Sequence, residues 1–570
     1  MVGTSSASRR APRLVLDLWP LLLAIVLCWP LLTQRGHPLA RDLVFVPRQP
    51  WTDASVGLGS SAPRAVPLDA VVSVLTAVVD GGILARLVLP LGLAAAGWGV
   101  HRLARDLGLL GRLVAGGVAV WNPYVVERTA LGQWALLLGY AALPWLLVAA
   151  SSYRAGGRAR DLGATAGWLG LASLTPTGGI LGSAAVLVSG SGRTVRTWWL
   201  LACCAALQLP WVLPALVGTA GATSDPDGVA VFDAGAEGPS GLLGTVLALL
   251  GTGGVWDAGS VPASRDLFWG PLTAVVAVAC LIGARRFLAR VPQLLRLVPL
   301  AGTGLALALF SSLPGGEDVM RVFVDHVPGA GLLRDAQKFL APYVVLVAVC
   351  AGACAQQLVR AVARHGTEVV LAVVVLAVSA PLVLLPDGAR ETWPTLEPVA
   401  YPSGLAAAAA VVDAGGGGDL ATLPWRSYRR FSWGRGLVSS DPAVRWFDVP
   451  VVVSDDLQVG SVLVRGEGVR ARRLGAALDG GPVGSALAAS GVRWALVYRD
   501  DPDADSLDLT GLSERYADDD IALYEVDGPT REPDGPTAVR RALVLVADLL
   551  ALLVVLVGVV AVVLAARRRR

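Results

Sequence analysis

Residues 14–51 read LVLDLWPLLLAIVLCWPLLTQRGHPLARDLVFVPRQPW and join two different kinds of sequence. The first half is apolar except for Asp17, and about 20 such residues are enough to cross a bilayer. The second half carries a carboxylate, Asp42, directly after Arg41, and ends in Trp51, a residue type favoured at membrane interfaces. The stretch therefore predicts a first membrane helix followed by a stiff loop that holds Asp42 at the membrane surface. Taken alone, Asp42 is better explained as a solvated loop charge next to a basic neighbour.

The composition extends this prediction to the whole chain. The sequence has 570 residues, of which 54% are apolar and 16% are charged. A soluble protein has about 25% charged residues, so the chain is predicted to be a polytopic α-helical membrane protein. All six cysteines fall inside apolar runs, which indicates packing residues and not a disulfide framework or a metal site.

Arginine clusters give the predicted orientation, because basic residues favour the cytoplasmic side of a membrane. We predict about 12 membrane helices with both chain ends in the cytoplasm, because in this topology every inner loop contains an arginine cluster. Residues 162–190 are read as two short helices, because Pro176 interrupts them and a single helix would invert all later loops. The expected spans are 14–32, 82–100, 113–121, 136–150, two within 162–190, 198–217, 267–282, 297–310, 340–358, 369–385 and 543–564.

The stretch 386–541 is more polar and is predicted to be a small extracytoplasmic α/β domain. Strand-like alternation occurs at 419–425, 492–498 and 521–526, whereas 405–412 and 473–478 are expected to be helical. The chain then divides into a membrane part (1–385), this domain (386–541) and a last membrane helix with a basic cytoplasmic tail (542–570). No glycine-rich phosphate loop follows a strand, which argues against a nucleotide-sugar domain and favours a lipid-borne donor.

Two further polar segments are expected near the outer membrane surface. The first follows the third predicted span and offers polar, charged and aromatic side chains that could contact a substrate, namely Asn122, Tyr124, Glu127, Arg128 and Trp134. Glu127 and Arg128 are neighbours in sequence, so on a helix they point in different directions, and a helix-end charge pair is the alternative.

The second polar segment contains His326, Arg334 and Lys338, the only lysine in the chain. Arg334 and Lys338 are four residues apart, so a helix would place both cations on one face, where they suit a phosphate. Interfacial cations that hold a lipid headgroup or Asp335 are an equally good alternative. A single loop histidine such as His326 is usually solvated, and no spacing typical of metal ligands is found.

Three motifs carry a resemblance to a known family. They are RDLVFVP at 41–47, WNPYVVER at 121–128 with GQW at 132–134, and LRDAQKF at 333–339. Together with the span layout, they resemble the GT-C superfamily of polyprenyl-phosphate-sugar-dependent glycosyltransferases, and in particular actinobacterial arabinofuranosyltransferase-like membrane proteins. The run SGVRWALV at 490–497 is similar to the soluble part of YfhO-like members.

The resemblance implies an inverting glycosyltransferase of the cell envelope in the plasma membrane. Its donor would be a polyprenyl-phosphate sugar, its acceptor a cell-wall glycan or lipoglycan, and no nucleic acid would take part. Asp42 is then the expected general base. Donor-phosphate contacts are expected from Arg334, Lys338 and Arg128, and substrate contacts from Glu127, Asn122, Tyr124, Trp134, Trp51 and His326.

The chain departs from the family at one position. Many members have two adjacent acidic residues in the first loop, whereas here Arg41 precedes Asp42. No metal ligands are assigned, and a divalent cation is the only cofactor that stays open. Two other functions also stay open, namely a transporter or flippase for lipid-linked glycans and a non-catalytic scaffold for envelope assembly.

Overall fold

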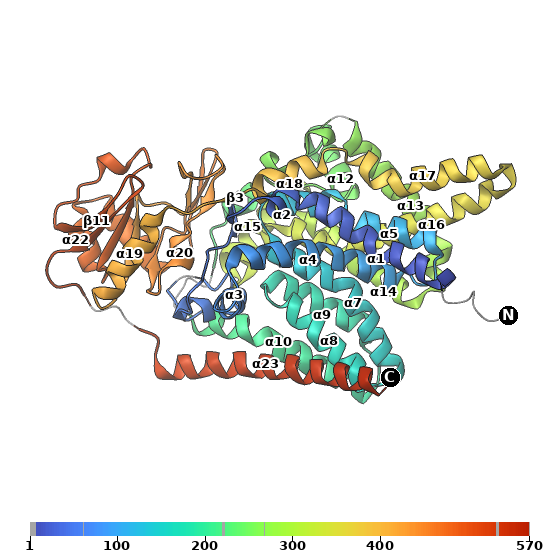
Figure 1. Ribbon diagram of the computed structural model, residues 1–570, viewed down its shortest axis with the longest axis horizontal. Helices are drawn as coiled ribbons and strands as arrows, with labels where there is room; N and C mark the ends of the chain where they lie inside the picture. The colour runs from blue at the N-terminus through green and yellow to red at the C-terminus, as the bar shows by residue number, and fades with distance from the viewer. Residues whose placement is uncertain (1–6, 61, 219–222, 267, 532–534, 569–570) are drawn as a thin grey trace.

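The computed structural model describes residues 7–60, 62–218, 223–266, 268–531 and 535–568. A bundle of long helices carries a mixed α/β domain at one end (Figure 1). Helix α1 (Ala7–Leu27) begins at the opposite end of the bundle, and the last helix, α23 (Ala538–Arg567), leaves the α/β domain and runs back to that same end.

Nine helices in the described part of the chain are long and apolar enough to cross a membrane. Such runs become helices because a bilayer offers no water to the backbone, so each N–H and C=O group must be paired within the segment. They are Gly81–Leu103 (α4), Leu109–Ala130 (α5 with α6), Trp134–Gly156 (α7), Val195–Val217 (α10), Trp269–Arg290 (α13), Pro292–Phe310 (α14), Ala336–His365 (α16 with its flanking turns), Thr367–Leu384 (α17) and α23.

The predicted total of about 12 is not reached by this criterion. The remaining expected spans correspond to shorter apolar stretches, namely Leu14–Leu27 of α1, α8 (Ala159–Ala172) and α9 (Pro176–Gly190). The predicted break between the last two is present, because the Thr175 hydroxyl accepts the Gly178 N–H at 3.1 Å and Pro176 begins α9. A Cβ on Gly139 of α7 would lie 3.0 Å from the Gly178 Cα, so the two glycines let α7 and α9 approach closely.

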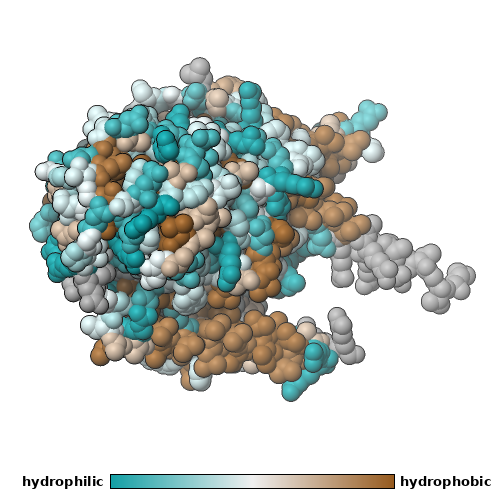
Figure 2. All heavy atoms as spheres, turned by 60° about the vertical axis from the view of Figure 1, so that its left-hand side comes forward, coloured by the Kyte–Doolittle hydropathy of each residue, from teal (hydrophilic) through white to brown (hydrophobic). Residues whose placement is uncertain are grey.

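The hydropathy of the outer surface differs between the helix bundle and the α/β domain. Figure 2 shows mostly hydrophilic atoms over the α/β domain in front and hydrophobic atoms on the helices behind it, including the region below, where α23 lies. The exposed residues of α23 include Leu549, Leu553 and Val557. A helix with such a surface is suited to contact lipid.

A five-stranded sheet forms the centre of the α/β domain, with strand order β11-β12-β10-β4-β7. Side chains alternate along β10 (Trp494–Tyr498), so Leu496 packs towards α19 (Ser403–Ala414) and Val497 packs towards α21 and α22. Helices therefore cover both faces of the sheet. The other elements of this part are β4 (Leu420–Leu423), β7 (Val451–Val452), α21 (Val469–Leu478), α22 (Val483–Ala489), β11 (Leu512–Ala517) and β12 (Ile521–Val526).

A small sheet connects the bundle to the domain. It has the order β2-β1-β3 and joins β1 (His37–Ala40) and β2 (Leu43–Val44), which follow the first helix, to β3 (Pro398–Val399), which precedes the domain. The sequence predicts a stiff loop here but does not predict strands for residues 37–44. They form a hairpin instead, because β1 pairs with a segment about 360 residues further along the chain.

Candidate functional site

Asp42 lies in the turn of this hairpin, at the end of the bundle that carries the α/β domain. Its N–H donates to the Leu131 carbonyl at 3.4 Å. Gly132, with φ +76°, lies so close to the hairpin that a Cβ there would be 2.5 Å from the Leu43 nitrogen. A left-handed glycine is therefore required at this contact. The turn between α6 and α7 thus holds the backbone of Asp42, while its carboxylate is exposed.

The preceding residue, Arg41, has φ +53°, a left-handed conformation that costs a side-chain-bearing residue about 1–3 kcal/mol. The surrounding structure fixes it. Its N–H donates to the Val438 carbonyl at 2.7 Å, and its own carbonyl accepts the Ser440 N–H at 2.9 Å. Its guanidinium pairs with Asp257 and donates to the Gly259 carbonyl at 3.3 Å. The strained turn is therefore held from both the domain and a loop of the bundle.

The carboxylate of Asp42 accepts a hydrogen bond from the Tyr428 hydroxyl. Tyr428 belongs to β5 (Tyr428–Arg429), which pairs with β6 (Ser439–Ser440) next to Arg41. Burial and the neighbouring Asp42 charge raise the pKa of Tyr428 well above its usual value, whereas Arg64 and Arg445 oppose this rise. The phenol therefore stays protonated and remains a donor to Asp42 at any physiological pH.

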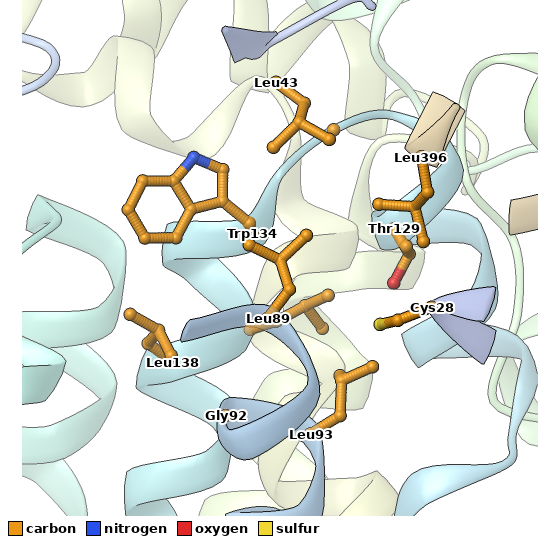
Figure 3. Close-up of a pocket in the computed structure, with 11 residues that line it drawn as sticks. Cys28, Leu43, Leu89, Gly92, Leu93, Thr129, Trp134, Leu138 and Leu396 are labelled. Atoms are coloured by element: carbon orange, nitrogen blue, oxygen red, sulfur yellow. The ribbon is translucent and has the colours of Figure 1, made fainter. Parts of the chain in front are cut away.

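An apolar pocket lies between α4 and α7, on the membrane side of the hairpin (Figure 3). Leu43, the residue after Asp42, lines it together with Trp134, whose indole also packs against Phe45 with ring centroids 5.0 Å apart. The other labelled lining residues are Cys28, Leu89, Gly92, Leu93, Thr129, Leu138 and Leu396. The cavity is small, about 20 Å³, and its lining residue Leu43 directly follows Asp42 in the hairpin.

Arg128 is fully buried and lies at the centre of a polar network. Its two terminal nitrogens bind the two carboxylate oxygens of Asp335 at 2.6 and 2.7 Å. Gln133 accepts from it at 2.7 Å and Gln337 at 2.9 Å. Although burial opposes ionisation, the charges of Arg128 and Lys338 hold the pKa of Asp335 below its usual range. All three guanidinium nitrogens are occupied, so this arginine joins α6 to the segment before α16.

Glu127 is also fully buried, next to a second carboxylate, Glu237. The two converge on Gly253, where a Cβ would lie 2.7 Å from Oε1 of Glu127 and 2.5 Å from Oε1 of Glu237. Arg265 pairs with Glu237, and its Nε lies 3.9 Å from Oε1 of Glu127. The Val255 N–H donates to Glu127 at 3.1 Å. Two buried acids that share one arginine hold the loop at 253–265 against α6.

The expected helical pair of Arg334 and Lys338 is wrong. Asp335, with ψ 70°, interrupts the helical conformation between two short 3-10 turns, Ala330–Leu333 and Ala336–Leu340, because it is drawn to Arg128. Lys338 lies 3.4 Å from Asp335. Arg334 instead reaches Glu467 of the α/β domain at 3.3 Å. The two cations therefore have different partners.

The other predicted site residues occupy three kinds of position. Asn122 caps α6 (Pro123–Ala130) by accepting the Val125 N–H at 3.0 Å, and the hydroxyl of the buried Tyr124 donates to the Lys338 carbonyl at 2.9 Å. Trp51 is 51% exposed. His326 is exposed at the end of α15 (Gly316–His326), 3.5 Å from Asp325.

Sequence reasoning missed several residues at this end of the bundle, namely Tyr428, Glu467, Glu237, Arg265 and Arg64. The first two come from the α/β domain and contact residues that are distant in sequence. Tyr428, for example, lies 386 residues after its partner Asp42, so no local pattern indicates the contact. Within the described residues, no group of three or more His, Cys, Asp or Glu side chains is arranged to hold a metal ion. The possible divalent cation stays a prediction.

Comparison with known proteins supports the fold. Neither a protein-family model nor a curated protein sequence matches the chain. Among solved structures, the mycobacterial arabinofuranosyltransferase AftD, determined by single-particle cryo-electron microscopy, matches 92% of this chain at 18% identity, with a TM-score of 0.57. A mutant form of AftD matches 92% of the chain at 18% identity, with a TM-score of 0.55.

The chain spans only 40% of the AftD chain in the first comparison and 42% in the second. At this level of identity the match concerns the fold alone, and the expected resemblance to an arabinofuranosyltransferase is present in the fold. The long helices and the α/β domain described above thus form an arrangement that resembles part of the arabinofuranosyltransferase AftD.

Proposed function

We propose that this chain is a cell-envelope glycosyltransferase that moves a sugar from a polyprenyl-phosphate donor to a glycan acceptor. One observation carries the proposal: the exposed Asp42 is next in sequence to Leu43, which lines a small apolar pocket together with Trp134. A lipid-linked sugar needs both features together, because its hydrocarbon tail must stay in the membrane while its sugar reacts at the surface. The fold shared with AftD agrees with this function.

In the proposed reaction, Asp42 accepts the proton of an acceptor hydroxyl as that oxygen attacks the anomeric carbon of the donor sugar. The bond from the anomeric carbon to the phosphate oxygen breaks, and its electron pair leaves with the polyprenyl phosphate. A single displacement of this kind inverts the anomeric configuration. The Tyr428 hydroxyl, which donates to one oxygen of Asp42, orients the carboxylate for this step.

The departing phosphate carries the charge that cations must stabilise. Arg334 is the best placed of the three predicted cations, because Arg128 is buried with Asp335 and Lys338 lies beside the same carboxylate. Trp134, at the mouth of the pocket, and the exposed Trp51 are the aromatic residues proposed to contact the sugars.

The substrate identities follow from the resemblance. Arabinofuranose is the proposed sugar, and a cell-wall glycan or lipoglycan is the proposed acceptor. The hairpin and the α/β domain would face the outside of the plasma membrane, with both chain ends in the cytoplasm, because the arginine clusters lie at the opposite end of the bundle.

The test is sugar transfer by the purified full-length protein in liposomes, using synthetic polyprenyl-phosphate sugars. Two substitutions on α4 provide a matched pair: Leu89→Trp fills the pocket, whereas Leu87→Trp changes a residue that is 52% exposed on another face of the helix. We expect Leu89→Trp to reduce transfer about a hundredfold, since a small displacement of a bound substrate has effects of this size. Equal activity of the two variants would contradict the proposed donor pocket.

A second candidate function, transport of a lipid-linked glycan, is favoured by a different residue. Asp548 lies within the membrane helix α23, and neither of its carboxylate oxygens has a hydrogen-bond partner among the described residues. Ionisable residues inside membrane helices often mark a transport pathway. Movement of a fluorescent lipid-linked glycan across proteoliposomes without a glycosylated product, and its loss in Asp548→Leu, would favour transport over transfer.

A further inference from the structure

One carboxylate oxygen of the α/β domain is bound by three groups of the membrane part. Oε1 of Glu467 accepts a hydrogen bond from the Ser224 hydroxyl at 2.6 Å. The same oxygen lies 3.3 Å from a terminal nitrogen of Arg334 and 3.4 Å from a terminal nitrogen of Arg64. Two guanidinium groups and a hydroxyl around a single oxygen are the donors that a phosphate group also prefers.

These three donors come from separate segments of the bundle. Arg64 precedes α3 (Leu68–Thr76), Ser224 lies between α10 and α11 (Gly228–Val231), and Arg334 follows the 3-10 turn at 330–333. Glu467 alone comes from the α/β domain, in the connection between β9 (Val462–Val464) and α21. The arrangement is therefore a set of donors built by the membrane part and filled by an acid from the domain.

The surroundings show why an anion is needed there. Burial and the like charge of Arg64 lower the pKa of Arg334, although Glu467 opposes this change. The nearby carboxylate of Asp225 accepts the backbone N–H groups of Asp227 at 3.0 Å and Arg465 at 2.7 Å. Asp225 is thus engaged by the backbone and acts on Arg334 only through its charge, whereas Glu467 contacts both guanidinium groups directly.

The position of the donors suits an anion that belongs to a lipid. Helix α3, which follows Arg64, exposes Val74 by 58%, and the chain continues to Val78, which is 88% exposed. Helix α15, which precedes Arg334, exposes Val322 by 61%. Short helices with exposed apolar faces lie in the interface of a membrane. The donor groups are therefore placed next to the two elements that are best suited to contact lipid headgroups.

We propose that Arg64, Ser224 and Arg334 form a binding site for the phosphate group of a polyprenyl phosphate, and that Glu467 occupies this site as an internal plug. The proposal rests on the proposed function in assuming a lipid-phosphate substrate. Binding of the phosphate displaces the Glu467 carboxylate from the two guanidinium groups. The α/β domain then loses one of its contacts with the bundle, so occupancy of the site and the position of the domain are linked.

The test is direct binding of undecaprenyl phosphate, which carries no sugar, to the full-length protein in nanodiscs. Glu467→Gln keeps the size of the plug and removes its charge. We expect this variant to bind the lipid about tenfold more tightly than the wild type, as for a site that is open in about a tenth of the molecules. Glu514→Gln makes the same change on the exposed strand β11 and should bind like the wild type.

A second comparison separates the plug from a general effect of charge. Adding Arg334→Gln to Glu467→Gln should abolish the gain, because the gain depends on the vacated guanidinium groups. The proposal is overturned if Glu467→Gln binds within twofold of the wild type, if Glu514→Gln shows the same gain, or if the gain survives Arg334→Gln. Parallel titration with inorganic phosphate shows whether the site takes the free ion or requires the lipid.

This readout is independent of sugar transfer. If Glu467→Gln gains affinity but the protein transfers no sugar, the phosphate site is supported and the proposed glycosyltransferase activity is contradicted. If the protein transfers sugar but Glu467→Gln shows no gain in lipid affinity, the activity is supported and only the role of Glu467 as a plug is contradicted. The melting temperature of each variant, measured in the same nanodiscs, identifies any change that is due to unfolding.

Discussion

Two clusters of charge lie at the same end of the bundle and differ in their exposure. Around Arg128 the charges are enclosed, with the Arg128 side chain 0% exposed and that of Asp335 8% exposed. Around Glu467 they are open to solvent on one side, since the Arg64 side chain is 57% exposed. The first cluster joins helices within the bundle, and the second joins the bundle to the α/β domain. The difference indicates that the enclosed charges stabilise the helix bundle, whereas the partly exposed charges can exchange one partner for another.

The largest expected effect comes from breaking the enclosed cluster. Arg128→Ala leaves the buried Asp335 carboxylate without its bidentate partner, and loss of one member of a buried pair costs about 3–5 kcal/mol. We expect a matching loss in the free energy of unfolding, measured by denaturant titration in detergent. Arg48→Ala removes the same side chain from an exposed position and is the control. Equal stability of the two variants would mean that the Arg128 network does not hold the bundle together.

The pH dependence of the same cluster gives the second prediction. The pKa of Asp335 is lowered in the folded protein, so its ionised form contributes stability that is fully present above the unfolded pKa of about 3.9. This contribution is lost as the pH falls through the lower, folded pKa. Asp335→Asn should therefore flatten the fall in melting temperature on acidification. A fall that is as steep as that of the wild type would show that other groups cause the acid lability.

The third prediction concerns the solvent-exposed carboxylate of Asp42. Tyr428→Phe removes the hydrogen bond to Asp42, and hydrogen bonds to charged groups are worth about 1.5–3 kcal/mol. We expect transfer to fall about tenfold. The loss should appear in kcat and not in KM, because the hydrogen bond orients the base and does not contact the donor.

Tyr524→Phe, on β12 of the same domain, is the matched control for this change. An unchanged kcat in Tyr428→Phe would show that its hydroxyl only fixes the domain to the hairpin and does not support the base.

The smallest effect is expected for Trp51. Trp51 is 51% exposed, so Trp51→Ala should change the free energy of unfolding by less than about 0.5 kcal/mol. If its ring contacts a bound sugar, KM rises about threefold while kcat is unchanged, as for uniform binding. A lowered kcat with unchanged KM would instead place Trp51 in the chemical step.

Much of the fold follows from local patterns in the sequence. The apolar runs predict the long helices, and the alternation at 521–526 predicts β12 with the bounds that are observed. The interruption at Pro176 predicts the division between α8 and α9. These features depend on neighbouring residues only. The hairpin at 37–44 was missed because its partner strand, β3, lies in a distant part of the chain.

The candidate site could be predicted only in part, for the same reason. Asp42 was identified from its position after the first helix. The helical pairing of Arg334 with Lys338 failed because Asp335 leaves the helical conformation to bind Arg128, which lies about 200 residues away. Glu467 and Tyr428 were not found, since nothing in their local sequence indicates a contact with the membrane part.

The account depends most directly on Asp42 as the base. Single-turnover transfer and donor binding, measured together for Asp42→Asn in liposomes, separate chemistry from binding. We expect donor affinity to stay within about twofold of the wild type while transfer falls at least about a hundredfold, as for loss of a general base. Asp318→Asn, an exposed carboxylate on α15, should retain wild-type transfer. Transfer by Asp42→Asn within tenfold of the wild type would contradict the role of Asp42 as the base.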